Sequence, residues 1–135
     1  MGVRHDRFMA VIDSSDRRAR RLIRKSAGLA TRCNAKFLVL YVQTSRESPD
    51  RIPLANQRYL INNFKLASEL GGTVIQKKSD DVRGAIIEAC AENKVSCMLA
   101  AKPEIGFFSL FVFGVRVKSF IEKLAKFNIN LSILS

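Results

Sequence analysis

Short apolar runs alternate along the chain with longer stretches whose apolar residues recur at helical spacing. A run of about four to eight apolar residues between polar or glycine residues is typical of a buried strand. Five segments fit this description: residues 7–12, 36–42, 73–76, 96–101 and 130–134. The second, KFLVLYV, is dense enough in apolar residues to be covered on both faces.

Four helices are expected between these strands, each with one apolar face. The residues predicted to face inward are Leu22, Ile23, Ser26, Ala30 and Cys33; Leu60, Ile61, Phe64, Ala67 and Leu70; Val82, Ala85, Ile86, Ala89 and Cys90; and Val117, Phe120, Ile121, Leu124 and Phe127. Residue types that favour helix N-termini cluster at 13–16 and 79–81 and predict caps for the first and third helices. Asn34 and the glycine pair 71–72 are expected C-terminal stops.

This alternation of strands and helices predicts the fold class. Strands joined by helices of this length run parallel, because the chain returns to the starting end of the sheet between them. We therefore predict an α/β fold, a five-stranded parallel doubly wound sheet with helices on both faces, formed by residues 1–135 as one domain. The last strand, 130–134, is expected at one edge of this sheet.

Charge is the unusual feature of the composition. The chain has 23 Lys and Arg against 12 Asp and Glu, and its formal net charge of +11 favours anionic partners. No apolar run is long enough to span a bilayer, and the first residues lack the apolar stretch of a signal peptide. We therefore expect a cytoplasmic protein, or the cytoplasmic domain of a membrane protein.

The sequence offers no catalytic or metal-binding constellation. Cys33, Cys90 and Cys97 are too widely spaced for a metal site, and we expect them to be small buried hydrophobic residues. The single histidine, His5, has no suitable triad partners around it and is expected at the surface. We therefore predict a protein that is not an enzyme and that holds no metal or cofactor.

The candidate ligand site follows the first predicted strand. In doubly wound sheets, ligands bind beyond the carboxyl ends of the strands, where the strand order reverses. Asp13 could accept hydrogen bonds from a base or a ribose there, while Ser14 and Ser15 could offer hydroxyls and amides to a phosphate. The same residues could instead only cap the following helix, and one residue can do both.

The run VIDSSDRRARRLIRKSAGLA at 11–30, followed by AKFLVLYV at 35–42, resembles the universal stress protein family. The run SDDVRGAIIEACAENKVSCMLAAK at 79–102 is similar to the third helix and fourth strand of that family. The resemblance covers essentially the whole chain. It is closest to the stress-protein module of KdpD, the potassium-responsive sensor histidine kinase, through YV after the second strand and DDV…AIIE.

The resemblance also bears on ATP. ATP-binding members carry a G-x-x-G loop, then nine residues, then G-S or G-T. These places fall here on Ala101, Glu104, Gly114 and Val115, and only Gly114 matches. Glu104 adds negative charge and Val115 removes a hydroxyl donor, so the resemblance implies a member that does not bind ATP in the usual way.

A different nucleotide is implied by the closest subgroup. KdpD modules in some bacteria bind cyclic di-AMP through serines after the first strand and an F-x-x-x-Y in the second. The residues that the resemblance and the strand-end placement assign to such a ligand are Asp13, Ser14, Ser15, Phe37, Tyr41, Val42 and Lys102.

Two segments leave alternatives open. Residues 105–113, IGFFSLFVF, are either core or an exposed patch for a partner domain, a second subunit or a membrane surface. Residues 17–25 carry six cations, which are either the solvated face of a helix or a surface for nucleic acid. Aromatic residues do not interleave with these cations as in a stacking platform, so we do not expect a nucleic-acid partner.

These observations predict a non-catalytic regulatory or sensory domain of the universal stress type, within a sensor kinase or a membrane transport protein. The alternative is a free-standing dimeric universal stress protein. The expected partners are a second copy of the chain, joined through the last strand, a nucleotide, and a kinase or membrane-protein domain.

Overall fold

The computed structural model describes residues 6–101 and 115–134 of the chain. The strands in these ranges are β1 (Arg7–Ile12), β2 (Lys36–Gln43), β3 (Thr73–Lys78), β4 (Cys97–Ala101) and β5 (Asn130–Leu134). The α-helices are α1 (Ala19–Arg32), α2 (Leu54–Glu69), α3 (Val82–Glu92) and α4 (Val115–Lys126), and a short 3-10 helix, η1 (Ser45–Glu47), follows β2.

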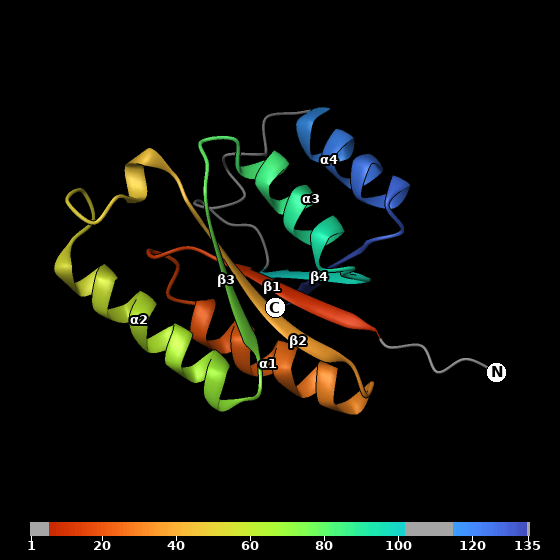
Figure 1. Ribbon diagram of the computed structural model, residues 1–135, viewed down its shortest axis with the longest axis horizontal. Helices are drawn as coiled ribbons and strands as arrows, with labels where there is room; N and C mark the ends of the chain where they lie inside the picture. The colour runs from red at the N-terminus through yellow and green to blue at the C-terminus, as the bar shows by residue number, and fades with distance from the viewer. Residues whose placement is uncertain (1–5, 102–114, 135) are drawn as a thin grey trace.

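The strands form a single five-stranded sheet in the order β3-β2-β1-β4-β5, and every pair is parallel. Helices α1 and α2 cover one face of the sheet, and α3 and α4 cover the other (Figure 1). The predicted fold class is confirmed, and β5 lies at the predicted edge. The order reverses at β1, because the chain first builds outward to β2 and β3 and then returns to β1's other side with β4.

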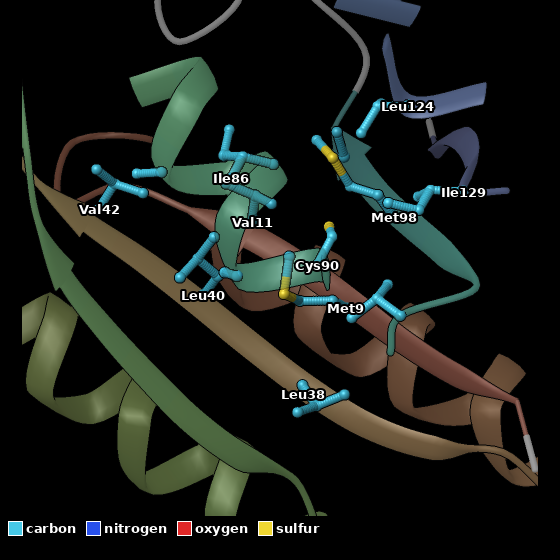
Figure 2. Packing of buried hydrophobic residues seen from close by; sticks show 14 of the residues in the cluster. Met9, Val11, Leu38, Leu40, Val42, Ile86, Cys90, Met98, Leu124 and Ile129 are labelled. Atoms are coloured by element: carbon cyan, nitrogen blue, oxygen red, sulfur yellow. The ribbon is translucent and has the colours of Figure 1, made fainter. Parts of the chain in front are cut away.

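The central strand β1 is covered on both faces. Met9 and Val11 pack toward α3 and α4, whereas Ala10 and Ile12 pack toward α1 and α2. Figure 2 shows Met9 and Val11 among side chains from β2, α3, β4 and α4. β1 therefore contributes to two cores at once. Each large apolar side chain that it buries contributes about 1.5–3 kcal/mol to stability.

Each of the four helices ends in the same way, with one residue in the left-handed region. These residues are Asn34 (φ 54°), Gly71 (φ 84°), Lys94 (φ 53°) and Asn128 (φ 58°). After α2, Gly72 donates its N–H to the carbonyl of Ala67 and Gly71 donates to that of Ser68, which is a Schellman motif. The predicted stops at Asn34 and Gly71 are confirmed.

The buried face of α2 differs from the prediction. Ile61 and Leu70 are exposed, at 52% and 42%, whereas Asn63 and Leu66 are buried with Leu60 and Ala67. The helix is rotated so that Leu60, Asn63 and Ala67 lie at the centre of its inner face. A prediction that followed apolar residues alone therefore passed over Asn63, whose amide has no hydrogen-bond partner within the described residues.

The last helix shows a smaller difference of the same kind. Phe120 and Leu124 are buried as predicted, but Ile121 and Phe127 are 44% and 54% exposed. Phe127 lies one residue beyond the end of α4, where the chain has already left the face that covers the sheet.

The cysteines differ in burial. Cys90 is buried and Cys97 is half-buried, and burial raises the pKa of the Cys90 thiol to about 12. Cys33 was expected to be buried but is exposed, because it is the C-cap residue of α1 and lies past its inner face.

Among the described residues, no helix has the length and apolar character needed to cross a membrane.

Lys94→Gly is expected to stabilise the protein. Lys94 is the only one of the four left-handed helix-end residues that is neither glycine nor asparagine, and a side chain at positive φ costs about 1 kcal/mol. Urea unfolding should show a gain of about 1 kcal/mol in the free energy of unfolding. Lys94→Ala is the control, because it removes the charge and keeps the strain. An equal gain from Lys94→Ala would show that backbone strain is not the cause.

Candidate functional site

The carboxyl ends of β1 and β2 lie side by side, and the polar residues of the predicted site follow β1. Ile12, the last residue of β1, is paired with Tyr41 of β2. Asp13 comes directly after Ile12, at the point of the sheet where the strand order reverses. This is the position at which open α/β sheets bind their ligands.

Asp13 holds the loop that leaves β1. One carboxylate oxygen, Oδ1, accepts hydrogen bonds from the Ser15 N–H (2.9 Å), the Ser15 hydroxyl (3.1 Å) and the Asp16 N–H (2.7 Å). Burial raises the pKa of Asp13, partly offset by these hydrogen bonds, which lower it. None of residues 6–101 and 115–134 donates a hydrogen bond to Oδ2, the other carboxylate oxygen.

The start of α1 corrects one prediction. The residues at 13–16 were expected to cap this helix, but α1 begins at Ala19 with Arg18 as its N-cap residue and without a side-chain cap. Asp16 instead accepts hydrogen bonds from the Arg18 N–H (2.9 Å) and from the Arg18 guanidinium at Nε and Nη2, both 3.0 Å. Asp13 and Asp16 therefore brace consecutive turns ahead of the helix, because aspartate bonds readily to backbone N–H groups two or three residues on.

The crevice between β1 and the end of β4 is narrow. Its lining residues are Val11, Ile12, Asp13, Asp16, Arg18, Ala19, Leu22 and Ala101. Its volume is about 10 Å³, which has room for about one water molecule. As lined by the described residues, this crevice is too small for a nucleotide.

Ser14, the next residue, is buried and bonded to Glu47. It is fully buried, and its N–H donates to the Glu47 carboxylate at 3.0 Å while its hydroxyl donates to the other oxygen of the same carboxylate. Tyr41 lies in the same cluster: burial raises the pKa of its hydroxyl, and the charge of Glu47 and a hydrogen bond to that carboxylate raise it further. Glu47 thus occupies the donors that Ser14 was predicted to offer to a phosphate.

The short helix η1 that carries Glu47 is held at both ends. Asp80, from the connection before α3, accepts a hydrogen bond from the Ser45 N–H at 2.7 Å, and this bond lowers the pKa of Asp80. The Gln43 side-chain amide donates to the Glu47 carbonyl at 3.4 Å. The Glu47 carboxylate is therefore positioned against Ser14 by contacts on two neighbouring segments.

The remaining predicted site residues are not gathered at this edge. Tyr41 is 2% exposed, with its ring edge-on to Phe64 at 5.8 Å between centroids. Phe37 is four residues earlier on β2, about 13 Å away, at the amino end of the strand and against Gly72. Val42 is buried on the opposite face, toward α3 and α4.

Several predictions lie outside the described residues. These are Lys102 of the expected ligand site, Glu104 and Gly114 of the ATP-loop comparison, the aromatic stretch 105–113, and His5. The two other positions of that comparison are described: Ala101 is the last residue of β4, and Val115 is the first residue of α4.

Glu47 is the site residue that sequence reasoning missed. It lies in a polar connection between β2 and α2, with no periodicity to mark it, and its partner Ser14 is 33 positions away. Only the pairing of β1 with β2 brings the two segments together. A signal was nevertheless present, because a serine two residues after a buried strand needs a partner when the loop around it is covered.

The structure superposes on solved universal stress proteins. One from Archaeoglobus fulgidus gives a TM-score of 0.64 at 14% identity, over 97% of this chain and 94% of that chain. A universal stress protein in complex with cAMP gives 0.63 at 15% identity, over 96% of each chain. A universal stress protein from Archaeoglobus fulgidus in complex with dAMP gives 0.59 at 12% identity, over 97% of this chain and 98% of that chain.

At these identities the likeness shows the fold alone, and the chain has the five-stranded parallel α/β fold of universal stress proteins. No protein-family model matches the chain, and no curated protein matches its sequence.

Glu47→Ala is expected to destabilise the fold. The substitution leaves the Ser14 N–H and hydroxyl without their acceptor in a buried place, which costs about 1–3 kcal/mol. Glu47→Gln keeps one acceptor oxygen and should cost less. The free energy of unfolding in urea measures both, and Glu69→Ala, on the exposed end of α2, is the control. Equal losses for Glu47→Ala and Glu69→Ala would contradict the assigned role of the carboxylate.

Proposed function

We propose that this chain is a non-catalytic regulatory domain that binds a small adenine nucleotide at the carboxyl edge of β1, and that it works within a sensor kinase or a membrane transport protein. The nucleotide that we place first is cyclic di-AMP. The sequence resemblance to KdpD modules supports the sensor-kinase setting and cyclic di-AMP as the ligand. The geometry of the β1 edge supports nucleotide binding without selecting the nucleotide.

The free oxygen of Asp13 is the observation that carries the proposal. Oδ1 is occupied by the loop, so the loop geometry fixes the carboxylate, while Oδ2 receives no hydrogen bond from the described residues. A fixed carboxylate with one free acceptor suits the 6-amino group of adenine or a ribose hydroxyl. Its place at the reversal of strand order is the position where such ligands bind in this class of sheet.

The proposed ligand carries one or two phosphates and not a triphosphate. The cAMP and dAMP of the two liganded neighbours each carry one phosphate. Cyclic di-AMP carries two phosphodiesters with one charge each, and no triphosphate. The sequence around the expected phosphate loop has alanine at 101, glutamate at 104 and valine at 115, which disfavours a triphosphate through lost donors and added negative charge.

Glu47 restricts which part of the ligand the edge can recognise. Its carboxylate holds both donors of Ser14, and Asp13 holds those of Ser15. A phosphate therefore finds no vacant donor on either serine. This supports recognition of the base or ribose by Asp13, and it leaves the phosphates to the residues that follow β4.

Burial also supports a non-catalytic role. The Ser14 hydroxyl donates to a carboxylate, which is the pairing of a nucleophile with a base. Ser14 is 0% exposed, however, so a substrate cannot reach its oxygen in this conformation. The pair therefore acts as a structural contact.

Asp13→Asn tests the proposed site. The amide oxygen can still accept from Ser15 and Asp16, so the loop should persist, but the charge that faces the ligand is lost. Titration calorimetry with cyclic di-AMP, cAMP, dAMP and ATP should show binding of the first, no measurable binding of ATP, and a loss of about 10- to 100-fold in the variant. Asp50→Asn, at an exposed loop position, is the matched control.

The pH dependence of the same titration gives a second readout. Burial raises the pKa of Asp13 above the ordinary aspartate value of 3.8, so its carboxylate takes up a proton at a higher pH than a free aspartate. Nucleotide affinity should therefore fall as the pH is lowered toward that raised pKa, and Asp13→Asn should not show this fall. Tight ATP binding, or equal affinities of the variant and the natural chain, would contradict the assignment of Asp13 as a nucleotide-binding residue.

Self-association through β5 is also part of the proposal, and it applies equally to the alternative of a free-standing dimeric stress protein. β5 lies at the edge of the sheet, where unpaired backbone groups can pair with a second chain. Sedimentation at high protein concentration should show a dimer that Ile133→Lys weakens. A monomer at all concentrations would contradict dimerisation, and a dimer that Ile133→Lys leaves intact would place the contact elsewhere.

A further inference from the structure

The positive charge of the chain is concentrated on α1 and the two residues ahead of it. Residues 17–32 contain seven cations and no acidic residue, so this segment accounts for +7 of the formal net charge of +11. The fold turns these cations outward, because the apolar face of α1 is buried against the sheet. Arg17, Arg20, Arg21, Arg24, Lys25 and Arg32 are all exposed.

Helix α2 extends the same surface. It lies beside α1 on the same face of the sheet (Figure 1), and its outward positions include Arg58, Lys65 and two large aliphatic side chains. Leu54 is 59% exposed and Ile61 is 52% exposed. We call this surface the basic face; it consists of Arg17, Arg20, Arg21, Arg24, Lys25, Arg32, Arg58, Lys65, Leu54 and Ile61.

Three cations of the basic face, Arg20, Arg21 and Arg24, are exposed and lie in no ion pair with a described residue. Arg17 is held over the ring of Tyr59 at 4.6 Å and donates to the Asn56 side chain, and both of these partners are neutral.

This arrangement costs the helix stability. Arg20 and Arg24, and Arg21 and Lys25, are like charges four residues apart on α1, and such pairs repel each other on a helix surface. Most of the cations also lie in the first half of α1, where the helix dipole disfavours positive charge. A solvated face normally mixes charges of both signs, as α3 does with Arg83, Glu88 and Glu92. A surface of one sign fits an anionic partner better than it fits water.

The exposed aliphatic residues favour a membrane over a nucleic acid. Leu54 and Ile61 can enter the headgroup region of a bilayer while the surrounding cations meet anionic lipids. Single-stranded nucleic acids are bound by stacking on aromatic rings, and Tyr59 is not free to stack, because Arg17 covers its ring and its hydroxyl accepts from the Arg20 N–H. We propose that the basic face docks on the surface of a bilayer that contains anionic phospholipids. The proposal rests on the outward surface of α1 and α2 and does not depend on nucleotide binding, although Arg17 follows directly on the carboxyl-edge residue Asp16.

Vesicle co-sedimentation of the whole chain tests the docking. The chain should bind phosphatidylcholine vesicles containing about one third phosphatidylserine, should not bind pure phosphatidylcholine vesicles, and should be released by high salt. Arg21→Glu with Arg24→Glu should weaken binding about 30-fold or more. Lys123→Glu with Lys126→Glu, at exposed positions of α4 on the opposite face, makes the same charge change and should leave binding within about twofold.

A second pair of variants separates a bilayer from other polyanions. Leu54→Ser with Ile61→Ser keeps every charge, so it should weaken vesicle binding and leave any binding to heparin or duplex RNA unchanged. Circular dichroism and thermal unfolding check that each variant is folded. Equal losses for the α1 and α4 charge variants would overturn the proposal, because binding would then follow net charge alone. Binding to duplex RNA without binding to anionic vesicles would overturn it as well.

Discussion

The enclosure of β1 is the constraint on which the rest of the structure depends. This strand is paired on both edges, with β2 and β4, and it is covered on both faces by the two helical layers. Asp13, at the carboxyl end of β1, is the first residue after this enclosed strand. Because the strand order reverses at β1, the same enclosure that stabilises the fold also places a carboxylate at the position where this class of sheet binds ligands.

Two carboxylates, those of Asp13 and Glu47, accept the hydrogen bonds of different donors at this edge. Asp13 uses one oxygen for its own loop and keeps the other free among the described residues, whereas both oxygens of Glu47 are bonded to Ser14. Glu47 comes from a connection 33 residues away, so it ties the β2–α2 segment to the end of β1. A ligand that displaced Glu47 would have to leave buried donors unpaired or satisfy them itself. Displacement of Glu47 is therefore coupled to the stability of the fold.

Much of the architecture could be predicted from residue pattern because period and local chemistry agree. The strands, the stop signals at Asn34 and Gly71 and the cap at Asp81 follow from neighbours within a few residues, and the parallel order follows from the helices that join the strands. Predictions failed where a distant contact decided the outcome. Asn63 is buried and Ile61 is exposed because packing against the sheet sets the rotation of α2. Likewise, the acceptor of Ser14 is a glutamate that no local pattern marks.

The most direct test of the account is to map nucleotide binding residue by residue. Backbone amide NMR spectra of the chain, recorded with and without cyclic di-AMP, would report which segments the ligand touches. If the nucleotide binds at the carboxyl edge, the largest shifts will fall on Asp13, Ser15, Asp16 and Ala101, with smaller shifts at Glu47. Shifts confined to the amino ends of the strands, around Arg7, Lys36 and Thr73, or no shifts at a saturating ligand concentration, would contradict binding at this edge.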